Sequence, residues 1–124
     1  MTAPFAVRLT RGAEQDLRHI HGYRLAHGRR AAADALLDTL VGRIDALRHF
    51  PDRGAVPPEL QTIGMRDYRQ IVSAPYRIIY RPIETTVFVV VLLVHVRRGD
   101  QRWQHLGRYD QQHQQQLIIV LLLV

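Results

Sequence analysis

Three runs rich in β-forming residues lie between positions 66 and 100 and are separated by breaks of turn length. The runs are 66–72, 76–82 and 87–96. Runs of this kind, joined by short breaks that contain proline or polar residues, are typical of an antiparallel meander. We therefore predict a three-stranded meander, and the rest of the chain is expected to cover one of its faces.

The last run is the most apolar, with eight consecutive apolar residues from Val87 to Val94. Such a run is typical of a strand that is buried on both faces or lies at the centre of a sheet. The run 76–82 alternates instead, because Tyr76, Ile78 and Tyr80 share one parity and Arg77, Ile79 and Arg81 share the other. If the strands pair in sequence order, one exposed surface is predicted to gather four arginines: Arg69, Arg77, Arg81 and Arg97.

Composition narrows the possible chemistry. All seventeen basic residues are arginine, and the formal net charge is +6. The absence of lysine excludes an amine base, and the absence of cysteine excludes disulfides, thiolate zinc sites and a cysteine nucleophile. The first five residues contain no basic segment followed by an apolar one, so we expect a cytoplasmic protein that is not exported. The charge favours an acidic or polyanionic partner.

The first half of the chain predicts a strand followed by two helices. The strand covers 5–9, and Thr10 can cap a helix that runs from Gly12 to His27, with Gly28 placed for a left-handed C-terminal residue. A second helix is predicted from Arg30 to Phe50, where Pro51 stops it. Together they would form a helical hairpin whose apolar stripes face the sheet. The segment 51–64 is expected to be an irregular connection.

After position 100 the chain predicts a short helix over 101–109, which carries Trp103 onto the core. A polar stretch at 111–116 then leads to the apolar tail 117–124. Eight apolar residues are far short of the ~20 that a membrane-spanning helix needs, so no membrane contact is expected. Three roles for the tail stay open: addition to a sheet edge, exchange into a neighbouring subunit, or no selected role. We expect one domain at 1–109, with 110–124 as linker and tail.

The order of strand, two helices and meander, together with three motifs, resembles the RelE/ParE family of toxins from type II toxin–antitoxin systems. The motifs are 64–69, 76–81 and the strand that ends in Val94-His95-Val96-Arg97-Arg98-Gly99-Asp100. The resemblance covers roughly residues 5–106. It implies an α+β fold in which a helical hairpin packs on a small curved antiparallel sheet, in β-α-α-β-β-β order.

The resemblance implies one of two activities. RelE-like members cut messenger RNA on the ribosome, and their phosphate-binding positions would fall on Arg69, Arg77 and Arg97, with Trp103 where many such nucleases carry tyrosine. An indole cannot exchange a proton as a phenol can, which leaves His95 as the candidate acid or base. In that reading the catalytic residues are Arg77, Arg97 and His95.

ParE-like members bind and inhibit DNA gyrase, and the strand ending with His95, Arg97, Arg98 and Asp100 is closer to that branch, with Gly99 as an insertion. We therefore expect a growth-arresting toxin that binds gyrase and is neutralised by a cognate antitoxin. Contact with operator DNA is expected only through that antitoxin, and the toxin could form a homo-oligomer. The residues expected to bind the antitoxin or the target are Arg69, Arg77, Arg81, Arg97, Arg98 and Trp103.

Plainer interpretations stay open for the same residues. Arginines on a strand often form a solvated outer face, and a histidine at the end of a buried strand is often a core residue. Neither the histidine spacing nor the remaining motifs indicate a metal site or a cofactor. Besides the gyrase inhibitor and the ribosome-dependent endoribonuclease, a third alternative is a non-toxic module that binds nucleic acid.

Overall fold

The computed structural model describes residues 3–94. The elements, in chain order, are β1 (Ala6–Leu9), α1 (Arg11–His27), α2 (Arg30–Asp45), the 3-10 turn η1 (Ala46–Arg48), α3 (Pro58–Gln61), β2 (Arg69–Ser73), β3 (Tyr76–Ile83) and β4 (Thr86–Val94). The predicted α+β class and element order are confirmed, with α3 as an addition. The predicted helix at 101–109, the linker and the tail lie outside the described residues. Among residues 3–94, no helix is long and apolar enough to cross a membrane.

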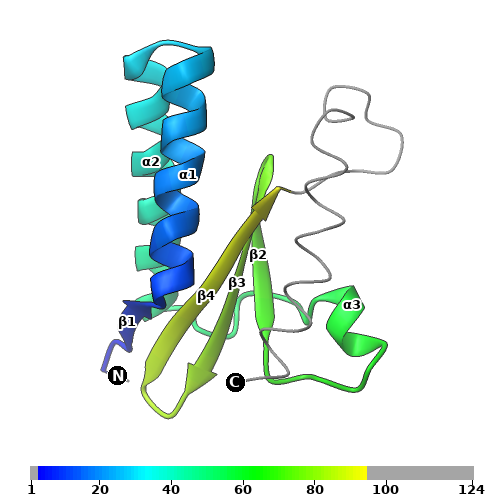
Figure 1. The fold of residues 1–124 in the computed structure, drawn as a ribbon. Coiled ribbons are helices and arrows are strands. Elements are labelled where there is room, and N and C mark those ends of the chain that lie inside the picture. Colours follow the sequence, from blue (N-terminus) through cyan, green and yellow to red (C-terminus); the bar gives the residue numbers. More distant parts are fainter. Residues whose placement is uncertain (1–2, 95–124) are drawn as a thin grey trace.

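The four strands form one open sheet in the order β1-β4-β3-β2 (Figure 1). The predicted meander is confirmed, since β2 pairs with β3 and β3 pairs with β4, both antiparallel. The sheet as a whole is mixed rather than antiparallel, because β1 pairs with β4 in parallel. Since β4 is parallel to β1 and antiparallel to β3, and β3 is antiparallel to β2, the strands β1, β2 and β4 all run in the same direction.

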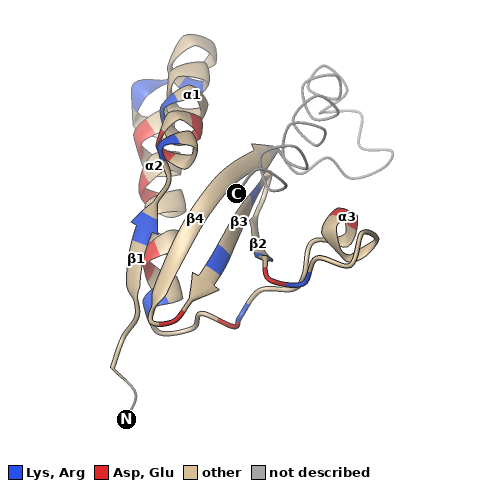
Figure 2. Cartoon of the chain, turned by 60° about the horizontal axis from the view of Figure 1, so that its bottom comes forward, with Lys and Arg blue, Asp and Glu red and all other residues tan. Residues whose placement is uncertain are grey.

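Strand β4 lies between two neighbours and carries no charged residue (Figure 2). Its register against β3 slips by one residue: Ile79 pairs with Val91 and Tyr80 pairs with Val89, which leaves Val90 as a bulge. A one-residue slip exchanges the two faces of a strand. Val89 faces the helical hairpin before the bulge, and Leu92 faces it after the bulge.

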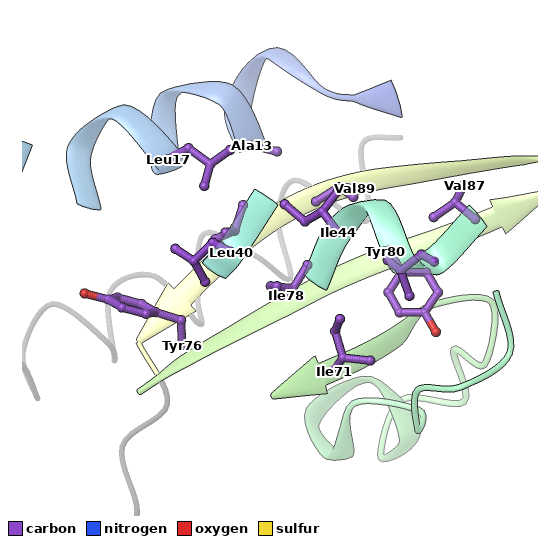
Figure 3. Packing of buried hydrophobic residues seen from close by; sticks show 12 residues of the cluster. Ala13, Leu17, Leu40, Ile44, Ile71, Tyr76, Ile78, Tyr80, Val87 and Val89 are labelled. Atoms are coloured by element: carbon purple, nitrogen blue, oxygen red, sulfur yellow. The ribbon is translucent and has the colours of Figure 1, made fainter. Parts of the chain in front are cut away.

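The hairpin of α1 and α2 covers one face of the sheet (Figures 1 and 3). The core cluster takes small and branched side chains from the helices and alternate residues from the strands. Its buried members are Ala13, Leu17, Leu40, Ile44, Leu47, Ile71, Tyr76, Ile78, Tyr80, Val87, Val89 and Leu92. Each fully buried side chain of this size contributes about 1.5–3 kcal/mol to folding, so this layer is the main source of stability.

The opposite face of the sheet is covered by the segment that contains α3. Leu60 and Tyr68 are fully buried there against Ile79 and Leu93. The connection 51–64, predicted to be irregular, thus includes a helical turn that begins at Pro58, where proline is well suited to the first helical position.

The helix ends differ from the prediction in two places. Gly28 is extended, with φ −168° and ψ −158°, and so is not a left-handed cap. The second helix ends at Asp45 and continues as η1, and Phe50 is 58% exposed instead of packing on the core. The residue before a proline disfavours helical geometry, which explains why the helix ends before Phe50 and Pro51 rather than reaching them.

The start of α1 holds the β4 bulge in place. The Thr10 hydroxyl accepts a hydrogen bond from the amide of Ala13 (3.1 Å), which confirms Thr10 as the N-cap, and it donates to the carbonyl of Val90 (2.9 Å). The Asp16 carboxylate accepts from the amide of Leu92 (3.0 Å). The Val90 carbonyl at the bulge and the Leu92 amide, which lies beyond the stretch of β4 that pairs with β1, therefore find partners at the start of α1.

Replacing Thr10 with alanine is expected to lower the free energy of unfolding by about 2 kcal/mol, because both the helix cap and the partner of the Val90 carbonyl are lost. Urea unfolding measures the change. Thr10→Ser keeps the hydroxyl and should lose less than half as much, and equal losses in both variants would contradict the role assigned to the hydroxyl.

Candidate functional site

Arg77 of β3 is buried, with 5% of its surface exposed. Its guanidinium donates to Gln70 Oε1 of β2, from Nε at 2.8 Å and from Nη2 at 2.5 Å, and also to the carboxylate of Glu59 on α3. A buried guanidinium is tolerated when a carboxylate and further acceptors surround it. The prediction that Arg77 lies on an exposed surface is therefore wrong, since the side chain ties α3 to the sheet.

Arg69 lies on the other face of the sheet. Directly paired residues of antiparallel strands share a face, and Arg69 pairs with Tyr80 whereas Arg77 pairs with Val72. Arg69 Nη1 donates to the carbonyl of Gly54 at 2.8 Å and to that of Asp52 at 3.2 Å. The predicted convergence of Arg69 with Arg77 is wrong, because the sheet itself separates the two guanidinium groups.

Arg81 shares the face of Arg77, as the alternation predicts, since both lie on β3 four residues apart. It is half-buried, and its guanidinium carbon lies 5.5 Å from the centre of the Tyr68 ring. Such a cation–π contact stabilises by about 0.5–1 kcal/mol when the site is partly exposed. Of the predicted strand arginines within residues 3–94, Arg81 is thus the one whose charge has no carboxylate partner within 4.0 Å.

The loop that Arg69 holds also receives the phenol of Tyr80. The Tyr80 hydroxyl is buried and accepts a hydrogen bond from the amide of Gly54 at 2.9 Å. A side chain at position 54 would place its Cβ 2.4 Å from the carbonyl oxygen of Gln70, so glycine is required by this close approach. Ala55 and Gln70 complete the attachment with two backbone hydrogen bonds, at 2.7 and 3.1 Å.

Burial raises the pKa of Tyr80, against the opposing effects of the Gly54 amide and the Arg69 charge. Burial likewise raises the pKa of Tyr76, where a hydrogen bond and the charge of Arg24 oppose it. Tyr80 therefore keeps its proton at neutral pH, and its oxygen is occupied by an amide of the chain itself. The arrangement fixes the loop and offers no acid or base to a substrate.

The other predicted site residues are His95, Arg97, Arg98 and Trp103. All four lie outside the described residues, so their roles stay predictions.

Sequence comparison places the chain in a known family. The profile of the ParE toxin of type II toxin–antitoxin systems (parDE) matches residues 7–103. This chain belongs to the ParE toxin family. The match covers more than half of the sequence and agrees with the expected RelE/ParE resemblance. A comparison with curated protein sequences gave no match.

Solved structures share the fold of this ParE-family toxin. One is from the chromosomal ParDE toxin–antitoxin system of P. aeruginosa, with 16% sequence identity and a TM-score of 0.63 over 77% of this chain and 100% of that chain. Another is from the toxin–antitoxin complex RelBE2 of Mycobacterium tuberculosis, with 22% identity and a TM-score of 0.54 over 76% of this chain and 100% of that one. At these identities the likeness concerns the fold.

Three residues important to the site were not predicted: Gly54, Glu59 and Gln70. Gln70 is the acceptor that faces Arg77, and no local pattern in the sequence indicates this role. Glu59 follows two prolines, which mark a helix start in the sequence and bring a carboxylate near its first turn. The sequence around Gly54 contains no distinguishing signal, because glycine is required there by the close approach of β2, which is distant in the sequence.

Alkaline titration of the native protein should show Tyr76 and Tyr80 losing their protons at higher pH than tyrosines of the unfolded chain. Because the folded-state pKa of Tyr80 is raised above the ordinary tyrosine value of 10.0, the contribution of Tyr80 to stability is complete below pH 10 and is lost as pH rises through the folded-state pKa. Tyrosinate absorbance of the native protein should show a late-titrating fraction. Tyr80→Phe should reduce that late-titrating fraction. It should also lower the free energy of unfolding by about 1–3 kcal/mol, since the Gly54 amide loses its acceptor. An unchanged titration in the variant would contradict the raised pKa assigned to Tyr80.

Glu59→Ala is expected to lower the free energy of unfolding by about 3 kcal/mol, because it leaves a buried guanidinium without its carboxylate. Chemical denaturation measures the loss. Asp67→Ala, which removes an exposed carboxylate from the same covering segment, is the matched control and should change stability by less than about 0.5 kcal/mol. Adding Arg77→Met to Glu59→Ala should recover part of the loss, and strictly additive losses would contradict the pairing.

Proposed function

We propose that this ParE-family toxin arrests growth in the cytoplasm by binding DNA gyrase and inhibiting it, and that a cognate antitoxin neutralises it. The observation that carries the proposal is the separation of Arg69 and Arg77 by the sheet. Each guanidinium is also engaged within the chain, Arg69 by loop carbonyls and Arg77 by a carboxylate and an amide.

A ribosome-dependent nuclease would need these arginines to act together. Charge stabilisation of a scissile phosphate requires guanidinium groups that converge within hydrogen-bonding distance of it. Arg69 and Arg77 are directed to opposite faces, and Glu59 already neutralises Arg77. An inhibitor that acts by binding makes no such demand, because it needs a stable surface rather than a converging set of charges.

In this proposal the two engaged arginines position the binding surface rather than form it. Arg77 holds the covering segment against the sheet, and Arg69 holds the loop beside β2. The residues proposed to contact antitoxin and target are Arg81, Arg97, Arg98 and Trp103.

The antitoxin part of the proposal has independent support. The two similar structures come from a ParDE system and a RelBE2 toxin–antitoxin complex. A formal charge of +6 would favour an acidic antitoxin segment that folds as it binds.

A gyrase supercoiling assay with purified protein tests the proposed target. We expect supercoiling to fall as the dose of toxin rises and to recover when the cognate antitoxin is added. Arg97→Ala should abolish both this inhibition and growth arrest in cells. The exposed Arg66, changed to alanine, is the matched control and should retain both effects.

Full gyrase activity in the presence of a toxin preparation that still arrests growth would contradict the proposed target. Growth arrest that survives Arg97→Ala would contradict the site while leaving the target open to the same supercoiling assay.

A further inference from the structure

Positive charge is unevenly distributed over the described part of the chain. Residues 3–94 contain thirteen arginines, and four of them lie within 18–30. This segment, the second half of α1 from Arg18 to His27 together with the turn and the first residue of α2, is called here the hairpin tip. It contains no aspartate or glutamate, whereas the other nine arginines are matched by nine acidic residues. By sequence, the charge excess of residues 3–94 therefore falls within 18–30, and Asp34 of α2 lies beside this segment through its contact with His21.

The tip arginines are available to a ligand. Arg18, Arg29 and Arg30 are exposed, and no carboxylate among residues 3–94 lies within 4.0 Å of any of their guanidinium groups. Arg24 is half-buried and engages Tyr76. The nearest acid along α2, Asp34, is bound to His21 at 2.7 Å. Figure 2 shows arginine segments on both helices toward the end where they join.

Helix dipoles do not explain the field at this end. The C-terminus of α1 and the N-terminus of α2 meet at the tip, and their partial charges have opposite signs. Since the two contributions largely cancel, the potential at the tip comes from the arginine side chains. Arg18 lies about 14 Å along α1 from His27, at 1.5 Å per residue, so the exposed arginines of the tip are spread along one helical hairpin.

The surface chemistry of the tip favours nucleic acid over a folded protein. Protein partners bind most strongly through aromatic and arginine anchors that are packed together and fully desolvated on association. Among the exposed large apolar residues of the described chain, Tyr23 is the one within the tip, and its ring is stacked on His27 with centroids 4.2 Å apart. Binding to a phosphate backbone needs no such anchor, because release of counterions from the duplex supplies most of the affinity.

We propose that the hairpin tip binds the phosphate backbone of duplex DNA directly, without regard to sequence, through Arg18, Arg29 and Arg30. This departs from the expectation that DNA is reached through the antitoxin alone. It does not depend on the proposed gyrase inhibition, because the contact is made by this chain in the absence of gyrase.

Fluorescence anisotropy of the full-length protein with a labelled 30-base-pair duplex tests the proposal (a length of about three helical turns). Three phosphate contacts predict a slope of about −3 in a plot of log affinity against log salt concentration. Arg29→Gln with Arg30→Gln should weaken binding at least about tenfold at low salt and reduce the slope to about −1. Circular dichroism and thermal melting confirm that the variant is folded.

Arg8→Gln with Arg66→Gln removes the same charge from exposed positions outside the tip and should leave the affinity within about twofold of the original. An equal loss in this control would overturn the proposal, since binding would then follow net charge. Loss of binding in Arg97→Gln with Arg98→Gln but not in the tip variant would place the contact elsewhere. Absence of binding at low salt, or preference for a polyglutamate peptide over DNA, would also overturn it.

Discussion

Strand β4 is the constraint on which the rest of this structure depends. From Val87 to Val94 it has no polar side chain, and it lies inside the sheet, so both of its faces must be kept from water. One face is covered by the helical hairpin and the other by the segment that contains α3. The bulge at Val90 decides which apolar residues go to which layer, and Thr10 and Asp16 provide partners for the Val90 carbonyl and the Leu92 amide.

The two covering layers determine what the arginines do. The covering segment needs an attachment to the sheet, and the buried pair of Arg77 and Glu59 supplies it. On the hairpin side Arg69 holds the loop that pairs with the edge strand β2. Arginines therefore serve the fold at the strands, where the family resemblance implied an exposed binding surface. The excess of arginine over acidic residues within residues 3–94 falls instead at the hairpin tip.

Most of the fold could be predicted from the sequence, because the signals for it are local. Helical spacing, the Thr10 cap and the breaks between strands indicated the hairpin and the meander correctly. The candidate site was predicted less well, because it depends on pairing between strands. Arg69 and Arg77 both have odd numbers, but Arg69 pairs with Tyr80 and therefore lies on the face of the sheet opposite Arg77. The two arginines were predicted to share a surface, and the sheet separates them. No local pattern contains that register, nor the approach of Gln70 that requires glycine at position 54.

We propose that this ParE-family toxin acts by binding rather than by cleaving RNA. Primer extension on messenger RNA in a purified translation system, with and without ribosomes, tests it most directly. We expect an intact message in both cases at protein concentrations that arrest growth in cells. Cuts that appear when ribosomes are present, and disappear when they are omitted, would contradict action by binding alone and would require Arg77 to be freed from Glu59 in the active state.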